Sequence, residues 1–311
     1  MTLDKILALG QTATELGLVN ALTVLSLFLS YWMLNVCDLS TDGCYTLGAA
    51  VGALVAIAGY PWLSLPAAML AGCVSGFVTA TLQTRLGVQS LLAGIVVNTG
   101  LYSVNLALTG NKATLSMNKV PTVFTMAKDL LKNTFLAGQS VLVVMLAAVL
   151  LVAIFLCVFL RTKLGLAIRA TGSNADMVRS SSINPAFTTT VGLCISNMFT
   201  ALSGCLMAQQ QKSFDINMGS GMVTVALASL LIGGVFVAKH RPVPMRAVGA
   251  VLGAVIFRIV YALALRFNMP AFMLKLVSSV IVVLAISGPY LRRQLPVMIR
   301  RWKASREGRK A

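Results

Sequence analysis

Histidine and acidic side chains are scarce in this chain. Its 311 residues include 1 His and 8 Asp or Glu residues, against 25 Lys or Arg residues. A lone His240 and 6 cysteines without a C-x-x-C pair offer no clustered ligands for a metal ion. The sequence also lacks a Ser/His pairing or a His/Asp/Glu cluster of the kind that indicates an enzyme. We therefore expect no catalytic residue, no metal and no cofactor in this chain.

Charged residues of both signs are few, and apolar residues dominate. The chain is 58% hydrophobic and 11% charged, with a mean hydropathy of +0.87. A soluble domain cannot hide so much apolar surface in one core, so lipid must cover most of it. Apolar runs of about 20 residues recur from end to end, and each is long enough to cross the bilayer as a helix. The sequence predicts an all-α, polytopic bundle of membrane-spanning helices.

The apolar runs and the connectors between them divide the chain into nine candidate spans. They cover residues 16–37, 43–59, 63–83, 90–109, 138–160, 187–208, 223–238, 247–267 and 272–289. The second and seventh are short enough to be broken or tilted helices. Allowing for uncertain ends, we expect about 8–10 transmembrane helices within a permease domain at residues 1–290, followed by a basic tail at residues 291–311.

Basic residues gather in connectors that alternate spans bring to one side. They include Arg85, the long connector at 161–186, Lys239 to Arg246, and the tail. Because Lys and Arg accumulate in short cytoplasmic loops, we expect a multi-pass protein of the cytoplasmic (inner) membrane with its C-terminus in the cytoplasm. The net charge of +17 is then explained by topology, and no nucleic-acid partner is expected. Nine crossings place the N-terminus outside, whereas a re-entrant segment between residues 40 and 59 reverses it.

None of the carboxylates lies in the centre of a predicted span. Ion-coupled carriers generally need carboxylates inside the membrane to bind and release the coupling ion. The chain also lacks the phosphate loop G-x-x-x-x-G-K-S/T, so any ATPase must be a separate polypeptide. The energy for transport is therefore expected to come from another chain.

The connector at residues 161–185 reads R-T-K-L-G-L-A-I-R-A-T-G-S-N-A-D-M-V-R-S-S-S-I-N-P. It resembles the cytoplasmic loop of the branched-chain amino acid and ribose type ABC permeases, which reads roughly T-x-x-G-x-A-I-R-A-x-G-x-N-x-x-M-A and then G-I-N. Residues 38–50 resemble the same family's D-L-S-x-G motif and small-residue helix, and residues 224–234 resemble its helix ending in Gly-Gly. Residues 100–106, 262–266 and 274–276 are most similar to a less characterised branch associated with aromatic amino acid uptake.

The resemblance implies a two-permease, two-ATPase importer fed by an extracytoplasmic substrate-binding protein, with a homodimer of this chain in the bilayer. It also implies that the 161–186 connector holds a short coupling helix that docks on the ATPase. The residues we assign to this docking are Gly165, Arg169, Ala170, Gly172, Asn174 and Asp176. The expected function is the permease subunit of an ATP-binding cassette importer for a small organic solute, an amino acid above all. The alternative is an ion-coupled secondary transporter or channel.

Polar residues inside the spans are candidates for the substrate path, because polar groups that face lipid are costly. Asp42 and Tyr45 begin one span, and Asn98, Tyr102 and Asn105 recur at helical spacing on another. Hydrogen bonding between helices explains the same pattern equally well.

Arg258 lies near the middle of an apolar span, where an unpaired guanidinium is expensive. It either meets a substrate carboxylate or acts in gating, or it pairs with a carboxylate such as Asp42 or with helix ends.

Overall fold

The computed structural model describes residues 3–118, 120–130, 132, 139–237 and 241–266, together with positions 276, 279, 280, 282, 283 and 287. The long helices are α1 (Leu3–Leu27) with its π-helical continuation η1 (Phe28–Met33), α2 (Thr41–Ile57), α3 (Ser64–Thr84), α4 (Ser90–Leu108), α6 (Ser140–Phe159), α9 (Pro185–Gln211), α10 (Met222–Phe236) and α11 (Val243–Arg266). The connectors hold α5 (Val123–Leu130), α7 (Lys163–Ser173), α8 (Ala175–Ser180) and the strands β1 (Thr114–Ser116) and β2 (Ser213–Asp215).

This architecture confirms the predicted all-α membrane bundle. Each of the first eight predicted spans coincides with a long helix, and within the described residues 6 helices are long and apolar enough to cross a membrane. The two that fall short are α2 and α10, at 17 and 15 residues, the same two spans that the sequence marks as broken or tilted. The ninth predicted span and the basic tail at 291–311 lie outside the described residues.

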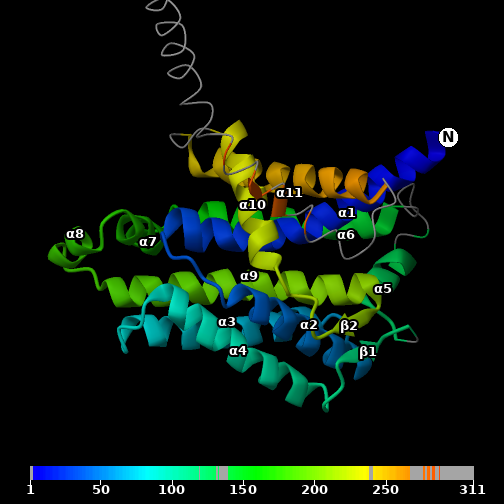
Figure 1. Cartoon of the computed structure of the whole chain (residues 1–311), viewed down its shortest axis with the longest axis horizontal. Coiled ribbons are helices and arrows are strands. Elements are labelled where there is room, and N and C mark those ends of the chain that lie inside the picture. Colours follow the sequence, from blue (N-terminus) through cyan, green and yellow to red (C-terminus); the bar gives the residue numbers. More distant parts are fainter. Residues whose placement is uncertain are drawn as a thin grey trace, which may run out of the picture.

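Helix α9 runs through the middle of the molecule. Figure 1 shows α1, α6 and α11 on one side of it and α2, α3 and α4 on the other. Small residues let the backbones approach: a Cβ atom at Gly48 of α2 would lie 2.0 Å from the carbonyl oxygen of Ala201, and one at Gly72 of α3 would lie 2.4 Å from that of Asn197. Gly48 and Gly72 therefore serve helix packing inside the bundle.

The contact between α1 and α9 contains a row of buried hydroxyl groups. The Ser26 hydroxyl donates to the carbonyl oxygen of Ser196 at 2.7 Å and shares a hydrogen bond of 2.7 Å with Thr200. One turn earlier on α1, the hydroxyl of Thr23 donates a hydrogen bond to the hydroxyl of Ser203 at 2.9 Å. Because lipid offers no hydrogen-bond partners, these bonds favour α9 as the neighbour of α1 and fix how the two helices align along their length.

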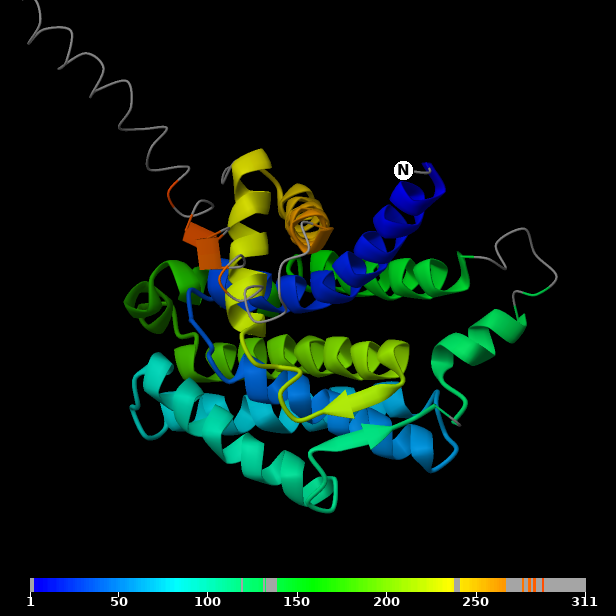
Figure 2. The ribbon, with the colours of Figure 1, turned by 45° about the vertical axis from the view of Figure 1, so that its right-hand side comes forward.

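Two helices begin inside the bundle rather than at its ends. Gly48 and Gly52 of α2 pack on Ala201 and Cys205, so α2 runs parallel to α9 and starts beside its middle. The backbone from 34 to 40 leads to this point without being helical. Helix α10 starts at the same depth, next to the first turn of α2, and runs crosswise to the other long helices (Figures 1 and 2). Each of the two short predicted spans is thus a helix that is preceded by irregular backbone.

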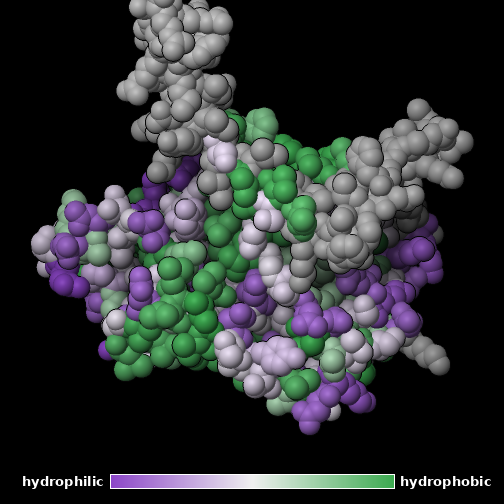
Figure 3. Space-filling model, in the orientation of Figure 1, coloured by the Kyte–Doolittle hydropathy of each residue, from purple (hydrophilic) through white to green (hydrophobic). Residues whose placement is uncertain are grey.

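The connectors gather at two opposite ends. At one end β1 pairs antiparallel with β2, with Leu115 opposite Phe214. At the other end α7 packs on η1 and α9 (Figure 1). On the visible face, Figure 3 shows hydrophobic surface across the middle and hydrophilic surface at the α7–α8 end. Arg246 at the start of α11 lies at the same end as α7, which agrees with the predicted grouping of these basic residues on one side.

The close approach of α2 and α9 gives a stability test. Replacing Gly48 by Ala forces a methyl group against the Ala201 backbone, so we expect a loss of about 1–3 kcal/mol, measured as a lower unfolding temperature in detergent. The matched control is Gly100→Ala on α4, where nothing lies within 4 Å of the added methyl group. Equal unfolding temperatures for the two variants would contradict the packing described here.

Candidate functional site

The centre of the site is the Asp42 carboxylate at the start of α2. Its two oxygens accept hydrogen bonds from the backbone N–H groups of Gly221, at 2.9 Å, and Val223, at 2.8 Å. These amides belong to the first turn of α10, whose unpaired N–H groups and helix dipole favour a negative charge. Gly221 has φ of +83°, a conformation in which glycine avoids strain. Asp42, which is half-buried, therefore joins the N-termini of α2 and α10.

Asp38 has a parallel role just before α2. One oxygen of its carboxylate accepts from the Ser40 N–H at 2.8 Å and the other from the Asn197 side chain at 2.8 Å. Asp38 is 1% exposed, and Asn197 lies near the middle of α9. As predicted, neither carboxylate lies in the centre of a helix, since Asp38 precedes α2 and Asp42 is in its first turn, but the bond from Asn197 places Asp38 beside the middle of α9. Helix α2 starts at mid-depth, so its first residues are interior residues.

Among the buried side chains whose polar atoms have no hydrogen-bond partner in the described part of the chain, three come from α1, α2 and α11. They are both amide atoms of Asn20 on α1, the hydroxyl of Tyr45 on α2 and Nε of Arg258 on α11. The Arg258 guanidinium lies 5.5 Å from the centre of the Tyr261 ring and is near the Tyr45 side chain. A buried polar atom without a partner is costly, which makes this group a candidate contact for a polar solute.

The packing of α1 against α11 and α9 brings Asn20 towards the region of Arg258 and Tyr45. Gly17, one turn earlier on α1, packs on Val255 and on Cβ of Arg258, and Thr23, one turn later, bonds to Ser203 of α9. Residues three apart lie on neighbouring parts of one helix face, so Asn20 lies between the α11-facing and α9-facing residues of α1. The sequence analysis missed Asn20, although an amide inside the first apolar run was the available signal.

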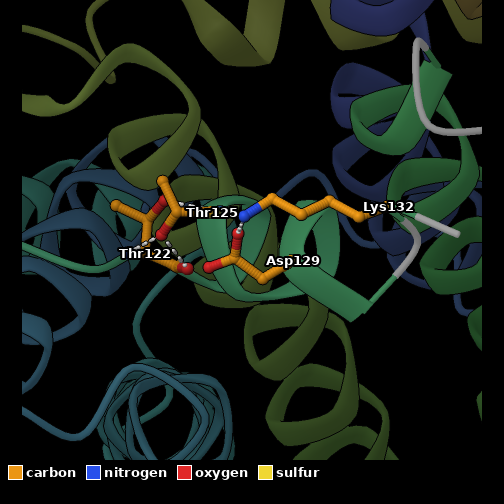
Figure 4. Close-up of polar contacts among 4 residues, drawn as sticks. All are labelled: Thr122, Thr125, Asp129 and Lys132. Atoms are coloured by element: carbon orange, nitrogen blue, oxygen red, sulfur yellow. Dashed lines mark hydrogen bonds and ion pairs between the residues drawn. The ribbon is translucent and has the colours of Figure 1, made fainter.

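The predicted alternative of an Arg258–Asp42 pair is not formed. Asp42 bonds to α10 instead, and within the described residues the ion pair present is the surface pair of Asp129 on α5 with Lys132 just after it (Figure 4). Figure 4 also shows Thr122 and Thr125 bonding to each other at the start of α5. Arg258 therefore has a cation–π contact with Tyr261 in place of an ionic partner.

The predicted polar face of α4 divides in two. Asn105 is buried and donates to the carbonyl oxygen of Gly43 at 3.3 Å, and Asn98 also faces Gly43. Tyr102 is 51% exposed on the outer surface. For Asn105 the structure thus shows hydrogen bonding between helices, and it brings neither asparagine together with Arg258.

The 161–186 connector folds into two short helices, and its predicted docking residues divide between the two faces of α7. A Cβ atom at Gly165 would lie 2.2 Å from the carbonyl oxygen of Phe159, and one at Gly172 would lie 2.1 Å from that of Met33. The two glycines therefore pack α7 against the bundle, so the part in coupling predicted for them would act through the position of α7. Arg169, Ala170, Asn174 and Asp176 are exposed.

Polar residues that carry the resemblance in this connector cap its helices. Thr162 accepts from the Gly165 N–H, Asn174 from the N–H groups of Asp176 and Met177, and Asn184 from the Ala186 N–H. Caps fix where each helix starts and therefore how the connector turns. They hold α8 away from the bundle with the apolar side chain of Met177 67% exposed.

Comparison with known proteins gives one family over most of the chain. The family described as "Branched-chain amino acid transport system / permease component" matches residues 13–286. The "Tyrosine transport system permease protein" of Clostridioides difficile is 32% identical over 268 residues, covering 86% of each protein. The "Ribose import permease protein RbsC" of Escherichia coli K12 is 25% identical over 253 residues, covering 80% of this chain and 75% of the relative. No solved structure gives a significant match.

The contact between Asp42 and α10 can be tested by a nearly isosteric change. Asp42→Asn removes the charge and turns an N–H donor towards backbone donors, so we expect a loss of about 1–2 kcal/mol in detergent. Asp129→Asn is the matched control, because an exposed ion pair contributes about 0–1 kcal/mol. If Asp42→Asn is no less stable than the control variant, Asp42 does not cap α10.

Proposed function

This chain belongs to the branched-chain amino acid transport permease family, and from that premise we propose that it is the membrane subunit of an ATP-driven importer. Membership confirms the resemblance found in the sequence, including its similarity to a branch with a tyrosine transport permease. It makes the chain a multi-pass membrane permease of a transport system for a small solute, and such permeases are not enzymes. The ATPase partner, the solute and the direction of transport are parts of the proposal.

The observation that carries the proposal is the exposed connector formed by α7 and α8. Its inner face is fixed on η1 by Gly172, while Arg169, Asp176 and Met177 face outward. An exposed methionine beside charged groups, on a segment held by helix caps, suits a protein partner that docks at this end. We assign the partner as an ABC ATPase, which places the α7–α8 end and the C-terminus in the cytoplasm of an inner-membrane protein.

The carboxylates inside the bundle favour this energy source over the ion-coupled alternative. Asp38 and Asp42 both have their oxygens occupied by backbone or amide donors. A coupling carboxylate must bind and release its ion in each cycle, which would break the contacts at the starts of α2 and α10. ATP-driven movement of α7 requires no such change at these residues.

The proposed solute is an amino acid, with tyrosine and its aromatic relatives foremost. The relative from Clostridioides difficile is named as a tyrosine permease. Within this chain, Arg258 supplies a guanidinium for a carboxylate, and Asn20 and Tyr45 supply unpartnered polar atoms nearby. Asp42 contributes to the path by placing α2, while Asn98, Tyr102 and Asn105 contribute through α4 packing or at its surface. A homodimer of this chain and an extracytoplasmic binding protein at the β1–β2 end complete the proposed importer.

Docking at α8 is tested by Met177→Glu. A carboxylate buried against the ATPase should weaken the complex by about tenfold or more, equivalent to about 1.4 kcal/mol, and reduce ATP-driven uptake in proteoliposomes. Leu130→Glu at the opposite end is the control, since Leu130 is also highly exposed. The proposal fails if Met177→Glu binds the ATPase as tightly as the control, or if the purified permease alone moves solute along an ion gradient.

If Arg258 contacts the solute, substitutions at this position should reduce transport without lowering the stability of the protein. Arg258→Lys keeps the charge but loses the two-pronged guanidinium geometry, so uptake should fall about tenfold or more while the unfolding temperature is unchanged. Arg258→Met should abolish uptake. Arg85→Met, at an exposed connector, is the control. A loss of stability in Arg258→Met would indicate a structural role, and full uptake would contradict any contact with the solute.

A further inference from the structure

Two arginines from distant parts of the chain share one cavity at the α7–α8 end. The cavity has a volume of about 390 Å³ and is lined by Trp32, Met33, Leu166, Arg169, Ala170 and Arg246. It therefore lies where η1, α7 and α11 come together. Arg246 and Arg169 are 77 residues apart, so only the fold brings their charges into one space.

Arg246 packs against two aromatic rings. Its guanidinium carbon lies 5.0 Å from the centre of the Trp32 ring and 5.8 Å from that of Phe28, both within cation–π range. Arg246 is partly buried, and the charge of Arg169 is close enough to repel it. In the part of the chain that the structure describes, no carboxylate pairs with either arginine. Two repelling guanidinium groups around one cavity favour an anion between them.

The surroundings of the cavity indicate the kind of anion. Met245, Val248 and Leu252 are exposed on α11 at helical spacing, and they form an apolar stripe that starts at the same end of α11 as Arg246, on a different face of the helix. Leu166, at the rim on α7, is exposed as well. Trp32 stands at the end of the η1 helix, as aromatic residues do at the boundary between hydrocarbon and headgroups. A ligand that is anionic at one end and apolar along its length fits both features.

We propose that the Arg169–Arg246 cavity binds the phosphate of an anionic phospholipid, whose acyl chains lie along the exposed stripe of α11. Arginine forks bind phosphate oxygens in pairs, and basic pockets between membrane helices bind lipid headgroups. A free phosphate ion satisfies the arginines but leaves the stripe without a role. The bound lipid ties α7 to η1 and α11. Its effect on coupling rests on the proposed function, whereas lipid binding itself does not.

The test uses the full chain in detergent, without solute, ATP or ATPase, so its outcome is independent of the proposed function. Unfolding temperature and retained lipid, by native mass spectrometry, are measured with phosphatidylglycerol, with phosphatidylcholine and with inorganic phosphate. We expect phosphatidylglycerol to raise the unfolding temperature by a shift on the order of 5 °C, and phosphatidylcholine and inorganic phosphate to give little change.

Arg246→Gln and Arg169→Gln should each lose most of the shift and of the retained lipid, and Arg161→Gln should keep both. Arg161 is the matched control because it is exposed near the same end without lining the cavity. Arg169 is exposed, so Arg169→Gln still decides the question if Arg246→Gln does not fold.

Three results would overturn the assignment. The first is a phosphatidylglycerol shift that survives in both cavity variants. The second is an equal shift from inorganic phosphate, which would make the cavity a site for free anions. The third is lipid retention that is unchanged in both cavity variants, which would place the bound lipid elsewhere on the chain.

Discussion

The Asp42 carboxylate and the two backbone N–H groups that it accepts form the contact on which the rest of the structure depends. Two segments of the chain, at 34–40 and 216–221, are not helical, and each leads directly into one of the two helices that Asp42 joins. Irregular backbone at membrane depth is tolerated only where protein satisfies its polar groups. Asp42 supplies this for the first turn of α10 and Asp38 for the turn before α2. Both helices can therefore start beside the middle of α9, facing an interior that contains Tyr45 and Arg258.

From this centre the molecule divides into parts with different tasks. The glycine contacts of α2 and α3 with α9 and the hydroxyl row between α1 and α9 leave little freedom for these helices to slide. Helix α10 lies across this group and reaches Trp32 of η1 through Gly234. Since α7 packs on η1 through Gly172, contacts run from Asp42 through α10 and η1 to the exposed α7–α8 connector. Movement of α7 by a partner would then bear directly on the start of α10. This chain of contacts gives the proposed coupling a physical path.

The sequence predicted the helices far better than their depths. The apolar run at 90–109 matches helix α4 (Ser90–Leu108), and the run at 63–83 matches α3 (Ser64–Thr84). Hydropathy predicts these helices well because it reports directly on which residues lipid covers. Hydropathy does not report where along the membrane normal a short helix starts, so Asp42 was taken for a residue at the end of a span. Its partners are backbone amides, which leave no mark in the side-chain pattern. For the same reason the sequence did not indicate that Gly172 packs α7 on the bundle, since a close approach to the Met33 carbonyl depends on residues far away in sequence. The resemblance of residues 161–185 to the permease family predicted the α7–α8 connector. No pattern in the sequence indicated that Arg169 and Arg246 line the same cavity.

The central claim is that α2 and α10 start side by side within the membrane, joined by Asp42. The most direct measurement is a cryo-electron microscopy map of the permease in a lipid nanodisc, at a resolution that shows side chains and the bilayer boundaries. The account predicts the Asp42 carboxylate near the bilayer midplane, within hydrogen-bond distance of the Gly221 and Val223 amides. A map in which α2 is a continuous span, with Asp42 among the lipid headgroups and away from α10, would contradict it.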